Sequence, residues 1–112
     1  MLLRASAQHH GKQVDLSVIR GGESDGGVEH GELLIRFAEA VLGEDEALLA
    51  AVRERLLKTL GPLALVDSAA VAGLFNAIDR VADATGIPVE AEKLAVSADY
   101  RDRLDIRRYR ER

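Results

Sequence analysis

The residues best suited to acid–base chemistry are two adjacent histidines near the N-terminus, His9 and His10. A histidine has an unperturbed pKa close to neutrality, so it can serve as a general base, a general acid or a metal ligand. Neighbouring residues on a helix point about 100° apart, so the pair is poorly placed to bind one ion. No carboxylate stands at ligand spacing, and we predict no metal site. His9 and His10 remain candidate catalytic residues, with Ser6 four residues before His10 as a possible nucleophile. A solvated or packing role is the simpler interpretation of both.

A second set of polar side chains follows one stripe of a predicted helix. Its members are Asn76, Asp79, Arg80 and Asp83, at i, i+3, i+4 and i+7. An arginine close to a core must be paired, because an unpaired buried charge costs several kcal/mol. One interpretation is a site in which Arg80 binds an anionic ligand. The interpretation that we favour is a buried ion-pair network that sets the register of helices or subunits.

Three smaller features have simpler interpretations. His30 can pair with Glu29 or cap a helix, and Asp67-Ser68 is most simply a capping feature near a helix start. The glycine-rich segment 21–27 lacks the Lys-Ser/Thr ending of a phosphate-binding loop. By composition, this segment is a flexible linker.

The composition restricts the classes of function. The chain has 112 residues, 47% hydrophobic, 30% charged and 4% aromatic, which fits one domain with an aliphatic core. It has no cysteine, which excludes disulfides, thiolate nucleophiles and sulfur ligands. We expect no cofactor. Whether the protein is an enzyme stays open.

The charge distribution argues against nucleic acid as a partner. The net charge is −4, although residues 99–112 carry six arginines and four acids. Because acids interrupt these arginines, the segment is typical of a solvated helix or a docking arm. We see no apolar run of about 18 residues, so we expect no membrane span and a cytoplasmic location.

Hydrophobic periodicity predicts three consecutive helices in residues 28–86. The first has an apolar stripe that ends before Gly43, and the second begins at Glu44-Asp45-Glu46 and ends at Gly61. Pro62 suits the first turn of the third helix, which we expect from about Leu63 to Thr85. The third helix has a wide apolar face, so we expect it to be central and covered on several sides. The apolar positions of the three helices are Leu33, Leu34, Phe37, Ala38, Val41 and Leu42; Leu48, Val52, Leu56 and Leu60; and Val66, Ala70, Leu74, Ala77, Ile78 and Val81.

These elements predict a single all-α domain built as an antiparallel helical bundle. Segment 1–20 is an N-terminal helical segment, 21–27 the linker, 28–86 the three-helix core and 87–112 a C-terminal arm. Residues 14–19 alternate as a strand would, but a lone strand has no partner here. We therefore favour a short helix that is capped by Asp15 and ended by Gly21.

Three segments of the chain resemble the carboxymuconolactone decarboxylase and alkylhydroperoxidase D-like superfamily. His30–Val41 is similar to the helix after the catalytic helix, and Phe75–Pro88 to the closing helix with its exit turn. Val14–Gly22 resembles the short helix between the catalytic helix and the next one. The likeness covers roughly residues 9–90 and consists of packing motifs.

The resemblance implies an all-α fold that assembles as dimers, trimers or larger rings. Active members carry a pattern E-x-x-C-x-x-x-H, in which a helix dipole stabilises the thiolate and a histidine relays the proton. With His10 at the histidine position, the cysteine position holds Ser6 and the glutamate position Leu3; with His9, the cysteine position holds Ala5. The chain thus resembles a truncated or degenerate member, and we expect no thiol peroxidase activity.

We therefore predict a homo-oligomeric helical protein of this type, because a single small domain can hardly cover the wide Ala/Gly-rich face of the third helix alone. Two alternatives stay open. One is a cysteine-independent decarboxylase or lyase that binds a small carboxylated substrate through Arg80 and uses His9 or His10 as its base. The other is a module that binds a partner through the Arg-rich C-terminal arm.

Overall fold

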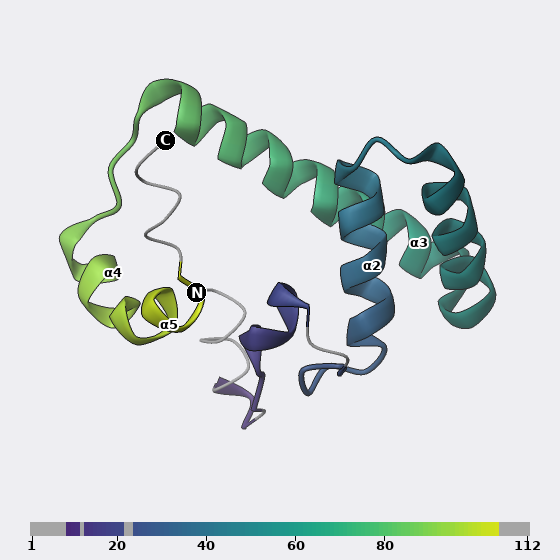
Figure 1. The fold of residues 1–112 in the computed structure, drawn as a ribbon, viewed down its shortest axis with the longest axis horizontal. Helices are drawn as coiled ribbons and strands as arrows, with labels where there is room; N and C mark the ends of the chain where they lie inside the picture. Colours follow the sequence, from purple (N-terminus) through teal and green to yellow (C-terminus); the bar gives the residue numbers. More distant parts are fainter. Residues whose placement is uncertain (1–8, 12, 22–23, 106–112) are drawn as a thin grey trace. The chain divides into compact units, whose positions relative to one another are not determined.

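The computed structural model describes residues 9–11, 13–21 and 24–105 (Figure 1). Every regular element in these ranges is a helix, which confirms the all-α prediction. The chain divides into two compact units. One is Glu29–Ile87, and the other combines the chain before it with the chain after it. The elements are the 3-10 helix η1 (Leu16–Arg20) and the α-helices α2 (Gly31–Leu42), α3 (Glu46–Thr85), α4 (Ala91–Val96) and α5 (Ala98–Arg103).

Helix α3 consists of two helical stretches that meet at Gly61. Gly61 has φ 83° and ψ 175°, outside the helical region, and Pro62 begins the second stretch. A positive φ is accessible to glycine without steric cost, and proline at a first helical position loses no hydrogen bond. The sequence prediction of two helices separated at Gly61 is therefore confirmed.

The other helix ends also follow the predicted residues. The Asp45 carboxylate accepts a hydrogen bond of 2.9 Å from the Leu48 amide and so caps the start of α3. Gly43 follows the last residue of α2, and Gly86, with φ 64°, ends α3 by donating its N–H to the Ala82 carbonyl.

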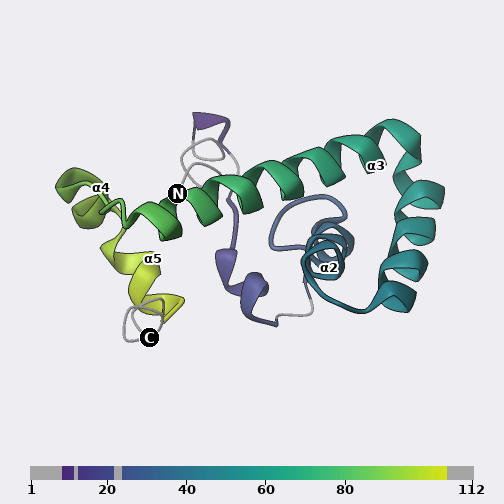
Figure 2. The same cartoon turned by 90° about the horizontal axis from the view of Figure 1, so that it is seen from above.

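The core of the 29–87 unit joins α2 to the first half of α3. Its buried side chains are Leu33, Phe37, Val52 and Leu56, and Leu65 from the second half packs at its margin. Figure 2 shows α2 lying against the bend of α3, while the rest of α3 continues beyond it as one long helix. Of the predicted apolar positions in α2 and the first half of α3, Leu42 and Leu48 are exposed. Leu42 lies on the far side of α2 from the core, and Leu48 lies in the first turn of α3.

The expectation that the third helix is central was wrong for this unit. Its side chains Leu63, Val66 and Leu74 are 81%, 65% and 59% exposed. Helix α2 covers only the opposite side of the stretch 62–85, where Leu65, Ser68 and Ala72 are half-buried. One neighbouring helix buries one face, so the predicted apolar face is left without cover.

In the other unit, residues 16–20 form the short helix that we favoured, and the strand alternative is wrong. The Asp15 carboxylate accepts a hydrogen bond of 2.9 Å from the Ser17 amide. Gly21, in the left-handed region at φ 103°, closes the helix by donating its N–H to the Val18 carbonyl. A single turn capped at both ends needs no partner strand.

Two glycines of the segment 21–27, Gly26 and Gly27, pack closely against the backbone of Asp15 and Gln13 in this unit. The Gly26 carbonyl accepts a hydrogen bond of 2.9 Å from the Asp15 amide. A Cβ on Gly27 would lie 2.3 Å from the Gln13 carbonyl oxygen, which is too close for any side chain. Both glycines have positive φ. The backbone here packs too tightly for other residues.

The C-terminal part of this unit is held by hydrogen bonds to helix α4. The buried Ser97 hydroxyl donates to the Lys93 carbonyl at 2.5 Å, and Arg101 donates to the Leu94 carbonyl at 2.8 Å. Lys93 pairs with Glu90, and Arg103 with Asp99 at 2.9 Å. The described arginines of the predicted arm are therefore engaged within the chain.

We expect replacement of Leu56 to destabilise the 29–87 unit far more than replacement of its neighbour Leu57. Leu56 is fully buried and Leu57 is 43% exposed. Leu56→Ala should cost about 2–5 kcal/mol, because it leaves a cavity in a small core. Urea unfolding followed by circular dichroism at one protein concentration measures this, with Leu57→Ala as the control. Equal losses for the two variants would contradict the assigned core.

We expect the order of residues 16–20 to depend on pH through Asp15. The hydrogen bonds from the Ser17 amide and hydroxyl, aided by the charge of Arg103, lower the pKa of Asp15 from its ordinary value of 3.8. Because the folded-state pKa lies below the unfolded value, the cap stabilises this helix above pH 3.8. Its contribution is lost as the pH falls through the folded-state pKa. The Ser17 amide NMR signal, titrated in the native chain and in Asp15→Asn, reports the change. An identical titration in the two proteins would contradict this role.

Candidate functional site

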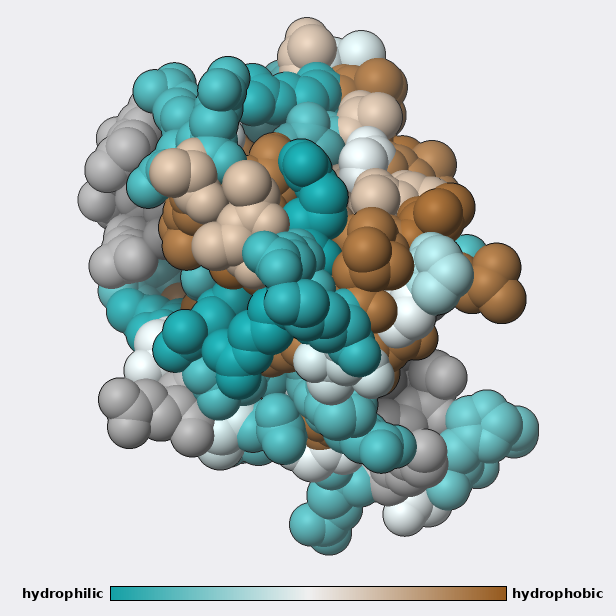
Figure 3. Space-filling model, turned by 90° about the vertical axis from the view of Figure 1, so that its right-hand side faces the viewer, coloured by the Kyte–Doolittle hydropathy of each residue, from teal (hydrophilic) through white to brown (hydrophobic). Residues whose placement is uncertain are grey.

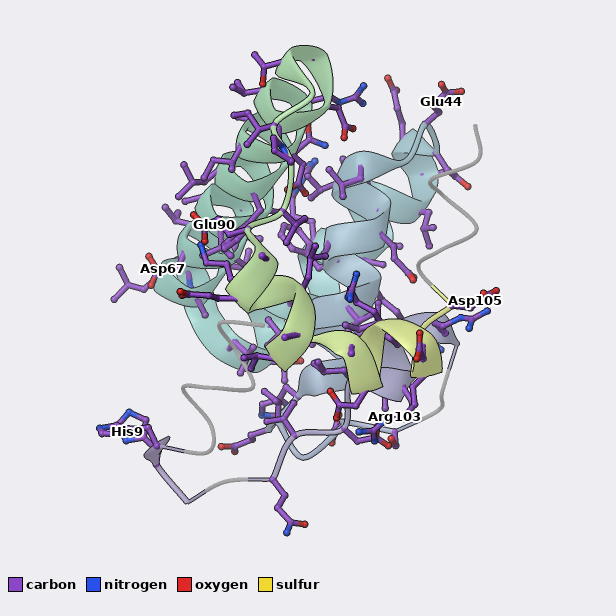
Figure 4. All side chains as sticks on the ribbon, turned by 90° about the vertical axis from the view of Figure 1, so that its left-hand side faces the viewer. His9, Glu44, Asp67, Glu90, Arg103 and Asp105 are labelled. Atoms are coloured by element: carbon purple, nitrogen blue, oxygen red, sulfur yellow. The ribbon has the colours of Figure 1, made fainter. Side chains whose placement is uncertain are left out.

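The two N-terminal histidines are exposed and lie against each other. Their rings meet edge to face at an angle of 80°, with centroids 5.2 Å apart. Figure 4 shows His9 projecting outward from its short segment. No group of three histidine or acidic side chains in the described part of the chain could hold a metal ion. Ser6, Ala5 and Leu3 lie outside the described residues, so a nucleophile–base pair with His10 stays a prediction.

The polar stripe on α3 is exposed, and the expected buried network is not present in this unit. Asp79, Arg80 and Asp83 are all exposed, and only Asn76 is half-buried. Among the described residues, no ion pair joins Arg80 to Asp79 or Asp83. The stripe lies beyond the reach of α2, so water solvates its charges in this unit. A network that sets the register of subunits stays a prediction.

Pairing of the histidines with Arg80 stays a prediction. His9 and His10 belong to one compact unit and Arg80 to the other. Asn76 lies one turn before Arg80 on α3 and can donate to the same anion, whereas the carboxylates of Asp79 and Asp83 would repel it.

His30 occupies a helix start without acting as a conventional cap. It precedes α2 with φ 58°, in the left-handed region, and its side chain makes no capping hydrogen bond. Its Nε2 atom lies 3.8 Å from the Glu29 carboxylate. The expected pairing with Glu29 is present.

A groove of about 340 Å³ lies between α2 and the second half of α3. Its walls are apolar apart from Asp67 and Ser68 at the rim, and Figure 4 shows Asp67 projecting outward from its helix. The expectation of Asp67-Ser68 as a cap is wrong, because both residues lie within α3. The groove is lined by Leu34, Phe37, Ala38, Asp67, Ser68, Val71 and Ala72.

One side of the stretch 62–85 presents apolar side chains that do not pack in the core of this unit. We call it the outer face, and it consists of Leu63, Val66, Ala70, Leu74, Ala77 and Val81, all exposed. At 100° per residue, these positions point in one direction along the helix. Exposed hydrophobic surface of this kind shows as a brown band in the space-filling view (Figure 3). Sequence periodicity identified most of these residues but assigned them to the interior.

Helix α3 is also long and apolar enough to cross a membrane by length and composition. This corrects the expectation that the chain has no such segment. Core helices of soluble proteins can have the same length and apolar composition, so these two properties do not assign the chain to a membrane. Asp67 and Asp79 interrupt the apolar sequence of the stretch 62–85.

The described part of the Arg-rich arm offers no free cationic cluster. Arg101 and Arg103 bond within the chain, as described above. Arg107, Arg108, Arg110 and Arg112 lie outside the described residues. Partner binding through this arm stays a prediction.

We expect Asp83→Asn to stabilise the protein slightly. Asp83 is exposed, lies in the last turn of α3 and follows Asp79 at i+4. Removing its charge relieves a like-charge pair and an unfavourable interaction with the helix dipole, so we expect a gain of a few tenths of a kcal/mol. Urea unfolding at fixed protein concentration measures the gain. Asp79→Asn should act in the same direction. A loss of more than about 1 kcal/mol would instead indicate a paired carboxylate.

The resemblance to the carboxymuconolactone decarboxylase superfamily stays a prediction. Comparison of the chain with protein-family models, with curated proteins and with solved structures gave no match.

Proposed function

We propose that this chain is a homo-oligomeric helical protein that associates with copies of itself through the outer face of α3. The observation that supports this is the exposure of a continuous apolar face over the whole stretch 62–85. An exposed apolar patch of more than a few hundred Å² is unusual on a monomer and marks an interaction surface.

The size of the face suits a protein interface. Besides the outer face, Val71 and Ile78 on its flank are about half exposed. From these exposed fractions, the surface amounts to on the order of 700 Å², close to the roughly 800 Å² per partner of a standard interface. A second copy presents an equal area of the same chemistry, so association would bury both faces at once.

A second copy explains the face better than a lipid bilayer. Asp67 lies among the apolar residues of the stretch, and Asp79, Arg80 and Asp83 follow in its second half. A charged side chain near the centre of a bilayer costs about 2.5–3.5 kcal/mol or more. At a protein interface these side chains can stay at the solvated rim.

The resemblance supports the same proposal, because members of the superfamily assemble as dimers, trimers or rings. It carries no activity over to this chain, since the chain has no cysteine. No described contact favours a catalytic role for His9, His10 or Arg80. Self-association is therefore the function that the structure supports best.

We expect Leu74→Glu to shift the protein from oligomer to monomer. Leu74 lies near the middle of the outer face, and an added carboxylate there would be desolvated on association. Light scattering coupled to size-exclusion chromatography at micromolar concentration measures the mass, and circular dichroism checks the helix content. Leu57→Glu is the matched control, because Leu57 is an exposed leucine of α3 outside this face.

The proposal requires an oligomeric native chain and an oligomeric Leu57→Glu variant. A monomeric native chain would overturn it and would indicate that another part of the same chain covers the face. Recovery of the native chain with floated neutral phosphatidylcholine vesicles, without self-association, would favour a bilayer and would also overturn it.

A further inference from the structure

We propose that two copies pair through the stretch 62–85 in antiparallel orientation, about a two-fold axis near Gly73 and Leu74. This inference rests on the proposed self-association and specifies its geometry. It follows from the order of large and small residues along the outer face, from the space around Gly73 and from the direction of the helix dipoles.

The apolar positions of the stretch are symmetric about its midpoint. In an antiparallel pair centred between Gly73 and Leu74, Val66 lies level with Val81 of the second copy, and Ala70 with Ala77. The same register sets Leu63 level with Ala84, all of them exposed positions. A two-fold interface must be self-complementary, because the same surface serves both copies. This order of residues meets that requirement.

The middle of the stretch permits close approach of the two helices. Ala70, Gly73 and Ala77 carry at most one side-chain carbon each, and a Cβ on Gly73 would meet no atom within 4 Å. Small residues at a crossing point let helix backbones come near, while larger residues pack on each side. Val66 and Val81 provide those larger residues at equal distances from the midpoint.

The helix dipoles favour the antiparallel orientation over the parallel one, because the dipoles of neighbouring helices attract when the helices run in opposite directions. By helical spacing, Asp67 and Arg80 lie on opposite edges of the outer face. Both charges therefore stay at the solvated rims of the antiparallel interface and do not enter its apolar centre.

The absence of cysteine from the native chain makes the register measurable by disulfide formation. The full-length double variant Ala70→Cys/Ala77→Cys and both single variants are oxidised under mild conditions. Residues 70 and 77 lie about 10 Å apart along one helix, beyond the roughly 7 Å between Cα atoms that a disulfide spans. Any disulfide in the double variant must therefore join two copies. Leu57→Cys reports the background from collisions.

We expect the double variant to be converted to a covalent dimer at least tenfold more than either single variant. The single variants should match the Leu57→Cys background. Mass spectrometry should find the peptide containing residue 70 joined to the peptide containing residue 77. Before oxidation, light scattering should give the mass of two copies for every variant.

Three results would overturn the inference. Efficient dimerisation of a single variant would indicate parallel helices, and a non-covalent dimer whose double variant does not cross-link would exclude this register. A native mass of three copies would exclude pairing of every copy about a two-fold axis while leaving self-association intact. A monomeric native chain, by contrast, would overturn the proposed function as well.

Discussion

The 29–87 unit depends on the packing of α2 against the first half of α3. Four side chains, Leu33, Phe37, Val52 and Leu56, form its buried cluster, and only Leu56 is completely inaccessible. Burying a side chain of this size contributes about 1.5–3 kcal/mol, and ordering the chain offsets most of that gain. A core this small leaves little stability to spare. Any further apolar burial, including burial against a second copy, would therefore add substantially to it.

The bend at Gly61-Pro62 decides what the rest of α3 does. Because Gly61 has a positive φ, the helix changes direction there, and the stretch 62–85 leaves the core after contributing Leu65 to its margin. The hydrophobic side chains of the outer face then have no partner in the unit. The exposed outer face is thus a consequence of the bend at Gly61 and of the position of α2 on the opposite side of the stretch 62–85. Self-association offers a physical reason for such a face to persist.

The polar candidate residues show that suitable residue types and spacing do not by themselves make a functional site. Asn76, Asp79, Arg80 and Asp83 have the spacing of a helical network, and they do share a side of α3. Their predicted burial depended on a covering element, and α2 crosses α3 before it reaches them (Figure 2). His9 and His10 are likewise a chemically capable pair that the described structure leaves in solvent. A catalytic or binding site requires surrounding structure that encloses its side chains, as well as side chains of suitable chemistry.

The sequence by itself determined the local structure, because local structure depends on residues close together in the chain. Asp15 and Asp45 cap helices, Gly21, Gly61 and Gly86 end or break them, and the apolar spacing defines their faces. Only the tertiary structure decided which faces are covered, since burial depends on the length and direction of neighbouring helices. It also showed that Gly26 and Gly27 are packed against backbone, a steric constraint that arises from residues distant in the chain. Periodicity can identify an apolar face, but it cannot distinguish a core from an interface, because both require the same residues.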